Sequence, residues 1–192
     1  MKINEIFYSL QGEGHFTGTP AVFVRFSGCN LKCPFCDTDH LPYTELSEQE
    51  IVESVAIFGA KHVVITGGEP TLQLSASLVG LLHDRGFFVQ IETNGSRRLP
   101  ESCNIDWVTC SPKEGAPIRL EHIDELKVLF HGKGKCDISA FEDIKAQCYS
   151  LQPLDTKDAE LNNIIIKETI DHILDHPIWR LSLQTHKMTG IK

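Results

Sequence analysis

The sequence lacks an excess of basic side chains and any long apolar run. Its 18 Lys and Arg residues are outnumbered by 26 Asp and Glu residues, which gives a formal net charge of -8. Binding to nucleic acid requires clustered positive charge to neutralise phosphates, so we expect no nucleic-acid partner. A membrane-spanning helix needs about 20 apolar residues, and a secretory leader needs a basic start before an apolar run. Since neither pattern is found, we expect no membrane association and a cytoplasmic location.

Internal repeats, low-complexity tracts and linker-like segments are also missing, so residues 1–192 are expected to form a single domain. The seven cysteines are an odd number, which is more typical of a protein in a reducing compartment than of a disulfide framework.

Strand-like and helix-like segments alternate along most of the chain. The predicted strands are 21–26, 62–66, 87–92, 105–110, 125–130, 148–151 and 179–183, and the predicted helices are 47–58, 71–85, 139–147 and 158–174. Alternation of this kind indicates parallel strands joined by right-handed crossovers. A closed eight-fold barrel takes about 250 residues. The chain is shorter and has few crossover helices, so the predicted fold is α/β, a partial and open (β/α) barrel.

Three cysteines, Cys29, Cys33 and Cys36, lie in one short loop with a Cys-x3-Cys-x2-Cys spacing. Ferredoxin-type clusters use four thiolates, so three would leave one iron open for chemistry. The alternative is a structural zinc site with His40 as a fourth ligand. The remaining cysteines show no ligand spacing and are expected to be ordinary core or surface residues; they are Cys103, Cys110, Cys136 and Cys148.

Further motifs follow the predicted strands. Gly67-Gly68-Glu69-Pro70 follows the second of them, Glu92-Thr93-Asn94 ends the third, and Ser111-Pro112-Lys113 follows the fourth. In parallel α/β folds ligands bind at the carboxyl ends of the strands, so these motifs and the cysteine loop are expected to meet in one site.

Two charged residues near the N-terminus have the chemistry to hold a small polar molecule. The carboxylate of Glu13, within Gln11-Gly12-Glu13-Gly14, can accept paired N–H groups from a guanidine-like edge. Arg25, four residues before Cys29, can bind a carboxylate bidentately.

Taken together, these motifs and the segment Gln184-Thr185-His186-Lys187 resemble those of the radical S-adenosylmethionine superfamily and, within it, of the 7-carboxy-7-deazaguanine synthase family. The resemblance implies a carbon–nitrogen lyase that contracts the ring of 6-carboxy-5,6,7,8-tetrahydropterin to 7-carboxy-7-deazaguanine with loss of ammonia. It implies three cofactors: a 4Fe–4S cluster, S-adenosylmethionine and Mg2+. It also implies a homodimer and an electron donor such as flavodoxin.

The resemblance assigns site residues by matching positions. The cluster ligands would be Cys29, Cys33 and Cys36, and Thr38 would bind Mg2+. The substrate-binding residues would be Leu10, Gln11, Gly12, Glu13, Arg25 and Thr66. The S-adenosylmethionine-binding residues would be Phe35, Cys36, Asp37, Gly68, Glu92, Ser111, Pro112, Lys113, Gln152, Pro153, Leu154 and Asp155.

This sequence departs from the family pattern in two ways. Many relatives end in a proline whose carboxylate lies near the substrate, whereas this sequence ends at Lys192. Some relatives carry an insertion between the first two cluster cysteines that is absent here. Two rival functions remain: a glycyl-radical activating enzyme, which has no use for Glu13 and Arg25, and a zinc-stabilised interaction domain, which has no use for the glycine motif.

Overall fold

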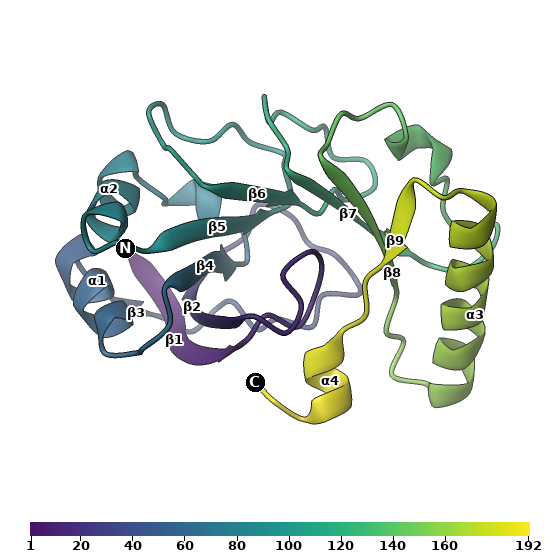
Figure 1. Cartoon of the computed structure of the whole chain (residues 1–192), viewed down its shortest axis with the longest axis horizontal. Coiled ribbons are helices and arrows are strands. Elements are labelled where there is room, and N and C mark those ends of the chain that lie inside the picture. The colour runs from purple at the N-terminus through teal and green to yellow at the C-terminus, as the bar shows by residue number, and fades with distance from the viewer.

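Nine strands form one curved sheet in the computed structural model, which describes residues 1–192 (Figure 1). The sheet order is β3-β1-β2-β4-β5-β6-β7-β8-β9. In chain order the strands are β1 (Lys2–Leu10), β2 (Pro20–Phe26), β3 (Thr44–Glu45), β4 (His62–Gly67), β5 (Phe88–Thr93), β6 (Trp107–Cys110), β7 (Glu125–Phe130), β8 (Cys148–Pro153) and β9 (Trp179–Leu181). Strands β2 and β4 to β9 pair in parallel, and β1 is antiparallel to both β2 and β3.

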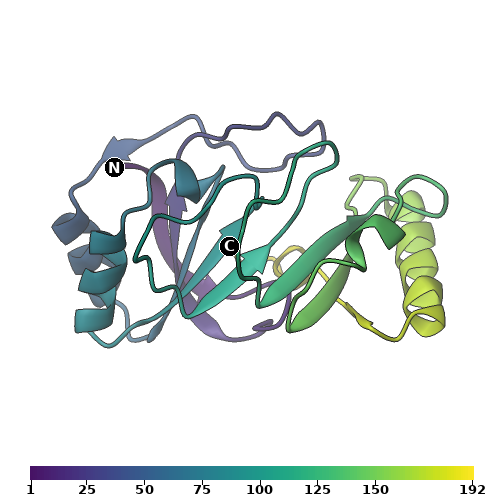
Figure 2. The ribbon, with the colours of Figure 1, turned by 90° about the horizontal axis from the view of Figure 1, so that it is seen from above.

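The helices are few and unevenly placed. They are α1 (Glu48–Ala56), α2 (Ala76–Asp84), α3 (Ala159–Asp175) and α4 (Thr185–Thr189), with two 3-10 turns, η1 (Pro70–Leu72) and η2 (Ser139–Phe141). Helices α1 and α2 lie against one end of the sheet and α3 against the other, while loops connect β5, β6 and β7 (Figure 2). None of the helices is both long and apolar enough to cross a bilayer. The prediction of a partial, open barrel is confirmed.

Side chains on the two faces of the sheet serve different purposes. On β7, Leu126 and Val128 point to the outer face and join the core under α3, whereas Lys127 and Leu129 line a cavity on the inner face. The other parallel strands alternate in the same way, because successive side chains of a strand point to opposite faces. The outer face therefore builds the core, and the inner face is free to carry polar groups.

Two clusters of buried apolar side chains make up most of the core. The larger one lies between the sheet and helices α1 and α2, and contains Ile65, Leu78 and Ile91. The smaller one lies between the sheet and α3, and contains Leu151 and Ile165. The capping box predicted at Ser47 and Glu50 is present at the start of α1.

Three predicted segments were wrong in detail. Residues 2–10 had no predicted strand, yet they form β1 and pair along β2. The predicted helix over 139–147 is only the turn η2: the Ala146 N–H donates to the Tyr149 hydroxyl and the Gln147 N–H to the Asp124 carbonyl, so the end of this segment is bonded outside a helix. The predicted helix over 71–85 begins only at Ala76, because Ser75 forms a new N-cap there.

Candidate functional site

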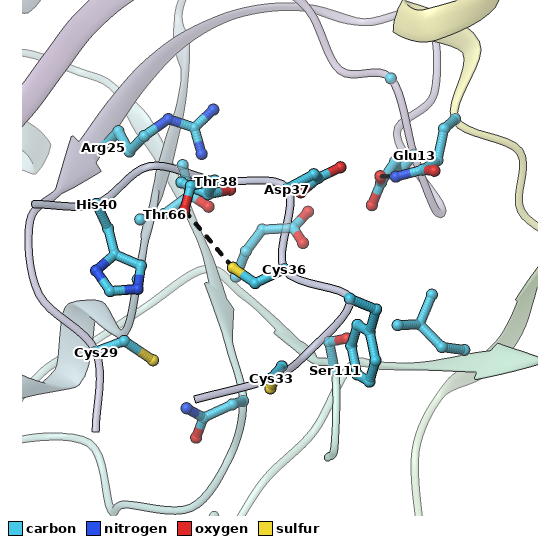
Figure 3. A pocket seen from close by; sticks show the side chains of 18 of the residues that line it. Glu13, Arg25, Cys29, Cys33, Cys36, Asp37, Thr38, His40, Thr66 and Ser111 are labelled. Atoms are coloured by element: carbon cyan, nitrogen blue, oxygen red, sulfur yellow. Dashed lines mark hydrogen bonds between the residues drawn. The ribbon is translucent and has the colours of Figure 1, made fainter. Parts of the chain in front are cut away.

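A cavity of about 890 Å3 opens at the carboxyl ends of the parallel strands, inside the curve of the sheet. Its walls come from the cysteine loop after β2, from the ends of β4, β5 and β8, from the loop after β1 and from α4. Figure 3 shows the three loop cysteines around this space, with Arg25 and Glu13 on opposite sides of the view. The strand-end motifs therefore meet in one place.

Nearly all of the predicted site residues line this cavity. The exceptions are Pro112 and Pro153, which are buried beside the lining residues Ser111 and Gln152 and do not face the space. Proximity to a common cavity does not by itself give each residue its role, so the individual assignments stay predictions.

The cysteine loop is held by backbone contacts with the glycine motif. The Gly28 N–H donates to the His40 carbonyl at 2.8 Å, and the Glu69 N–H donates to the Gly28 carbonyl at 2.9 Å. A Cβ atom at Gly68 would lie 2.2 Å from the Gly28 carbonyl oxygen and 2.9 Å from the Cβ of Cys29. Only glycine fits here, because the two loops approach more closely than any side chain allows.

The three thiols suit a multi-atom cluster better than a single ion. All three are free and face the cavity. Thiolates bound to one zinc ion at about 2.3 Å would lie about 3.8 Å apart. The three loop sulfurs do not all lie within 4.8 Å of one another, so at least one pair is farther apart than two thiolates on a single zinc ion. A set of three thiols is the donor set of an iron–sulfur cluster with three protein ligands.

A lysine lies close to the cysteine loop. Burial, together with the neighbouring thiols Cys29 and Cys36, raises the pKa of Cys33, and the charge of Lys113 opposes that rise. The Lys113 ammonium group is held by the Ser111 carbonyl at 2.6 Å and by the Ser111 hydroxyl at 2.7 Å. A fixed positive charge at this point favours the thiolate form that binds iron.

The remaining four cysteines lie away from the cavity lining. Burial raises the pKa of Cys103 to about 11 and that of Cys110 to about 12. Burial also raises the pKa of Cys148 to about 11 and shifts that of Cys136 upward. Burial thus disfavours the thiolate form of these four residues, and none of them lines the cavity where a metal could be bound.

Glu69, in the glycine motif, connects the ends of two strands. Its carboxylate is fully buried and accepts from the Thr71 N–H at 3.0 Å, the Thr93 hydroxyl at 2.8 Å and the Asn94 N–H at 2.8 Å. A buried carboxylate needs such donors, and through these hydrogen bonds Glu69 links the ends of β4 and β5.

Lys127 is a central site residue that the sequence analysis missed. Its buried ammonium group lies 2.7 Å from Glu13 Oε2 and 2.7 Å from Glu92 Oε2, and so links two predicted ligand-binding residues. Gln184 from the C-terminal segment donates to Glu13 at 2.8 Å, and Gln11 donates to Glu92 at 3.0 Å. A signal was present, since Glu125 and Lys127 are charged residues at alternate positions of an otherwise apolar strand.

The charges of this cluster shift its pKa values in different directions. Burial alone would raise the pKa of Glu13, but the Lys127 ammonium group outweighs it and lowers that pKa to about 2. Burial, together with the Glu13 and Glu125 carboxylates, raises the pKa of Glu92 despite Lys127. The three carboxylates overcome the effect of burial on Lys127 and hold its pKa above the ordinary value. Glu13 therefore stays ionised at neutral pH, and Glu92 takes up a proton more readily than Glu13.

Arg25 lies on the inner face of β2, and its guanidinium group contacts both Glu5 and Phe7. Its Nε donates to Glu5 Oε1 at 2.9 Å, and its guanidinium carbon lies 5.7 Å from the centre of the Phe7 ring. Lys192 also pairs with Glu5 and lines the cavity. The bond through Nε leaves the two terminal nitrogens of Arg25 free to bind an anion bidentately.

The C-terminal helix α4 closes one side of the cavity through Lys187. Its ammonium group lies 2.7 Å from Asp37 in the cysteine loop and 3.0 Å from Asp155 after β8. A backbone bond from Lys157 and the side chains of Lys187 and Asn162 lower the pKa of Asp155 to about 2. Lys187 thus joins three segments that are far apart in the sequence.

An open (β/α) sheet with three thiols at its carboxyl edge defines a radical S-adenosylmethionine protein, and a family model described as the Radical SAM superfamily matches residues 23–133. Within that superfamily, the chain belongs to the 7-carboxy-7-deazaguanine synthase family. It is 52% identical over 191 residues to the 7-carboxy-7-deazaguanine synthase of Bacteroides thetaiotaomicron, covering 100% of this chain and 98% of that one. It is 41% identical to the synthase of Nitratidesulfovibrio vulgaris, with 99% and 98% covered.

A solved structure, titled as the crystal structure of QueE from Escherichia coli, matches with a TM-score of 0.77. The two chains are 33% identical, and the match covers 96% of this chain and 94% of that one. Membership of the superfamily implies a 4Fe–4S cluster and S-adenosylmethionine as cofactors.

Proposed function

We propose that this chain is a 7-carboxy-7-deazaguanine synthase, a carbon–nitrogen lyase that converts 6-carboxy-5,6,7,8-tetrahydropterin to 7-carboxy-7-deazaguanine and ammonia in queuosine biosynthesis. The observation that carries the proposal is a single cavity. Three free thiols line one of its walls, and Arg25 and Glu13 line other walls. The full-length identity to relatives that bear this name supports it.

Cys29, Cys33 and Cys36 would hold the cluster, which supplies, when bound, the electron for cleavage of S-adenosylmethionine. The protein's own contribution is to place the reactants and to exclude water from them. Gly67 and Gly68 let the end of β4 pack directly against the backbone of Phe26 and Gly28, because a Cβ atom at either position would overlap that backbone. Lys187 holds the cysteine loop against the segment after β8 and so limits the opening on that side.

The substrate would lie between Arg25 and Glu13. Arg25 would bind its carboxylate through the free guanidinium nitrogens. Glu13 would accept N–H groups from its guanidine-like edge, because a carboxylate has about four acceptor positions and only two are used by Lys127 and Gln184. The low pKa of Glu13 keeps it in the charged form that this role needs.

The comparisons favour this function over both alternatives. A glycyl-radical activating enzyme would not need the buried Glu13–Lys127–Glu92 cluster beside its cofactor. A zinc-stabilised interaction domain would not need a cavity of this volume beside its cysteines.

The substrate assignment predicts different effects for the two charged residues. Each charged hydrogen bond is worth on the order of 1.5–3 kcal/mol, so Arg25→Ala should weaken binding of the carboxylated pterin by roughly ten- to a hundred-fold. The same variant should hardly change the weak binding of a pterin without the carboxylate. Glu13→Gln should weaken both. Anaerobic titrations of both variants with both ligands measure this, and equal losses in Arg25→Ala would assign that arginine to the fold, where it pairs with Glu5.

We further propose that Thr38 contributes to a Mg2+ site. Its side chain faces the cavity beside Cys36 and Asp37, and its hydroxyl is engaged in no hydrogen bond within the chain. Mg2+ prefers oxygen ligands and keeps several waters, so one hydroxyl together with substrate oxygens would suit it.

Thr38→Ala should leave the cluster absorbance and the cleavage of S-adenosylmethionine unchanged but reduce the stimulation of product formation by Mg2+. The reason is that the variant removes one oxygen ligand and none of the thiolates. Rates measured over a range of Mg2+ concentrations test this, with Thr44→Ala, an exposed position in β3 outside the cavity, as the control. An undiminished response in Thr38→Ala would place the metal elsewhere.

The electron donor, for which flavodoxin is our proposal, would dock beside the cysteine loop. A surface hollow next to the cavity is lined by Arg97, Arg98 and Arg119, and Leu31 of the cysteine loop belongs to both spaces. In a chain with a net charge of -8, this group of arginines is a local exception. It suits an acidic partner, because complementary charge speeds the encounter of two proteins.

Charge reversal at Arg97 and Arg119 should slow reduction of the cluster by flavodoxin by roughly ten-fold or more at low salt, and less at high salt. Reduction by the small reagent dithionite should be unaffected, which separates docking from damage to the cluster. Stopped-flow bleaching of the cluster absorbance measures both rates. Equal rates with flavodoxin before and after reversal would move the docking face.

The homodimer implied by the family resemblance and the cytoplasmic location expected from the sequence composition remain part of this proposal. Sedimentation of the cluster-loaded protein would measure the oligomeric state directly.

A further inference from the structure

Glu142, His172 and His176 form a cluster that takes no part in the cavity described above. One ligand atom from each residue lies within 4.8 Å of those of the other two. Glu142 follows η2, whereas His172 lies in the last turn of α3 and His176 is its C-cap. The cluster is therefore built from two segments separated by β8 and most of α3 (Figure 1).

The two imidazole rings are arranged as a pair of ligands on one helix face. They are four residues apart, which places them one above the other, and their rings stack at 4.2 Å with an interplanar angle of 16°. Nδ1 of His176 lies 3.0 Å from the His172 carbonyl oxygen. A carbonyl oxygen can only accept, so Nδ1 must carry the proton and the lone pair of His176 is on Nε2. A hydrogen bond of this kind is how metal-binding histidines are commonly oriented.

His172 and Glu142 each have a ligand atom that makes no hydrogen bond within the chain. Nε2 of His172 is buried and has no hydrogen-bond partner. A buried polar atom of this kind calls for an explanation, and an unrecorded ion is one of the standard ones. Glu142 accepts a hydrogen bond from Trp179 Nε1 at 3.3 Å through one oxygen only, so that bond orients the carboxylate and leaves the second oxygen free.

The electrostatic setting favours a cation at this position. The cluster lies at the C-terminal end of a helix of 17 residues, where the helix dipole is negative. Asp175 adds a further negative charge in the same turn.

We propose that Glu142, His172 and His176 bind a zinc ion that fastens segment 137–147 to the C-terminal end of α3. Two imidazoles and a carboxylate are a common zinc donor set, with water as a fourth ligand. Mg2+ is not the expected occupant, because it prefers oxygen ligands over imidazole. The site would act on structure, since it lies outside the cavity where the radical chemistry is proposed.

Zinc binding can be measured without reference to turnover. Anaerobic, cluster-loaded protein with saturating Mg2+ is titrated with Zn2+ against a chromophoric chelator, and its iron content is checked afterwards to show that the cluster is intact. We expect one zinc ion per chain. His176→Ala and Glu142→Gln should each weaken this binding by at least roughly ten-fold, because even loss of an outer-shell partner costs ten- to a hundred-fold.

Both variants are expected to fold, since His176 is exposed and Gln at position 142 can still accept the bond from Trp179. His122→Ala is the matched control, because it removes another exposed imidazole bound to a carboxylate, and its zinc affinity should equal that of the unaltered protein. The proposal is overturned if the protein with its iron–sulfur cluster intact binds no zinc, or if both variants bind zinc as tightly as the control.

Hydrogen exchange tests the structural role separately. Zn2+ should slow amide exchange in segment 137–147 of the unaltered chain and have no effect on that segment in His176→Ala. Zinc binding without such protection would overturn the fastening role.

Discussion

Replacing Cys33 with alanine is expected to abolish both the iron–sulfur absorbance and turnover. Three thiolates are the smallest set that holds a 4Fe–4S cluster and still leaves one iron open, so no ligand is spare. Cys29→Ala and Cys36→Ala should have the same effect. The iron content and absorbance of reconstituted protein, together with anaerobic product formation, measure it.

The other cysteines provide the control. Cys103, Cys136 and Cys148 lie away from the cavity, and burial raises the pKa of each thiol. Alanine at any of these positions should leave iron content unchanged. A variant among them that lost as much iron as Cys33→Ala would show that the ligand assignment is wrong.

Lys127→Met is expected to destabilise the protein more than any other single change in the cavity. The variant leaves Glu13 and Glu92 buried without their cation, and breaking a buried ion pair costs about 3–5 kcal/mol. For a chain of this size that corresponds to a fall in melting temperature of roughly 6–20 °C. Thermal unfolding followed by circular dichroism measures it. The exposed Lys167→Met is the control and should change little.

A second substitution distinguishes charge from packing. Lys127→Met combined with Glu92→Gln removes one of the stranded carboxylates and should recover part of the lost stability. If the double variant melts no higher than Lys127→Met alone, then packing of the lysine side chain, and not its charge, is what the protein needs.

The same cluster predicts how stability depends on pH. The folded pKa of Glu13 is about 2, below its ordinary value of 4.5, so its contribution is fully present above pH 4.5 and is lost as pH falls towards 2. In Lys127→Met the cause of the low pKa is gone, and this part of the acid dependence should become smaller. Urea unfolding at a series of pH values would show the difference.

Much of the site could be predicted because it lies at strand ends. Each of the first parallel strands leads directly into a recognisable motif. Parallel strands bring their carboxyl ends to one edge of the sheet, so the order of the strands in the sequence was enough to predict that these motifs meet. The thiol spacing and the Gly67–Gly68 turn are local features, which a sequence displays in full. What the structure added here is the close packing of Gly68 against Gly28 in the cysteine loop.

The parts that escaped prediction depend on contacts between distant residues. Lys127 acquires its role only when β7 lies beside Glu92 and the loop of Glu13, which are 35 and 114 residues away along the chain. The segment 139–147, predicted as a helix, instead bonds at its end to Tyr149 and to the carbonyl of Asp124, which is 23 residues away from Gln147. Strand β1 pairs with β3 over only two residues, so it depends on its long pairing with β2 on the other side.

The division between the two faces of the sheet also bears on how such an enzyme can change. Outward side chains such as Val128 pack in the core, while inward ones such as Lys127 and Thr66 contact the cavity, and the backbone of the sheet keeps the two groups apart. Substitutions at sites without shared partners tend to add their effects independently. A new ligand preference could therefore be selected on the inner face while stabilising changes accumulate on the outer one, which makes this small sheet a tractable scaffold for laboratory evolution.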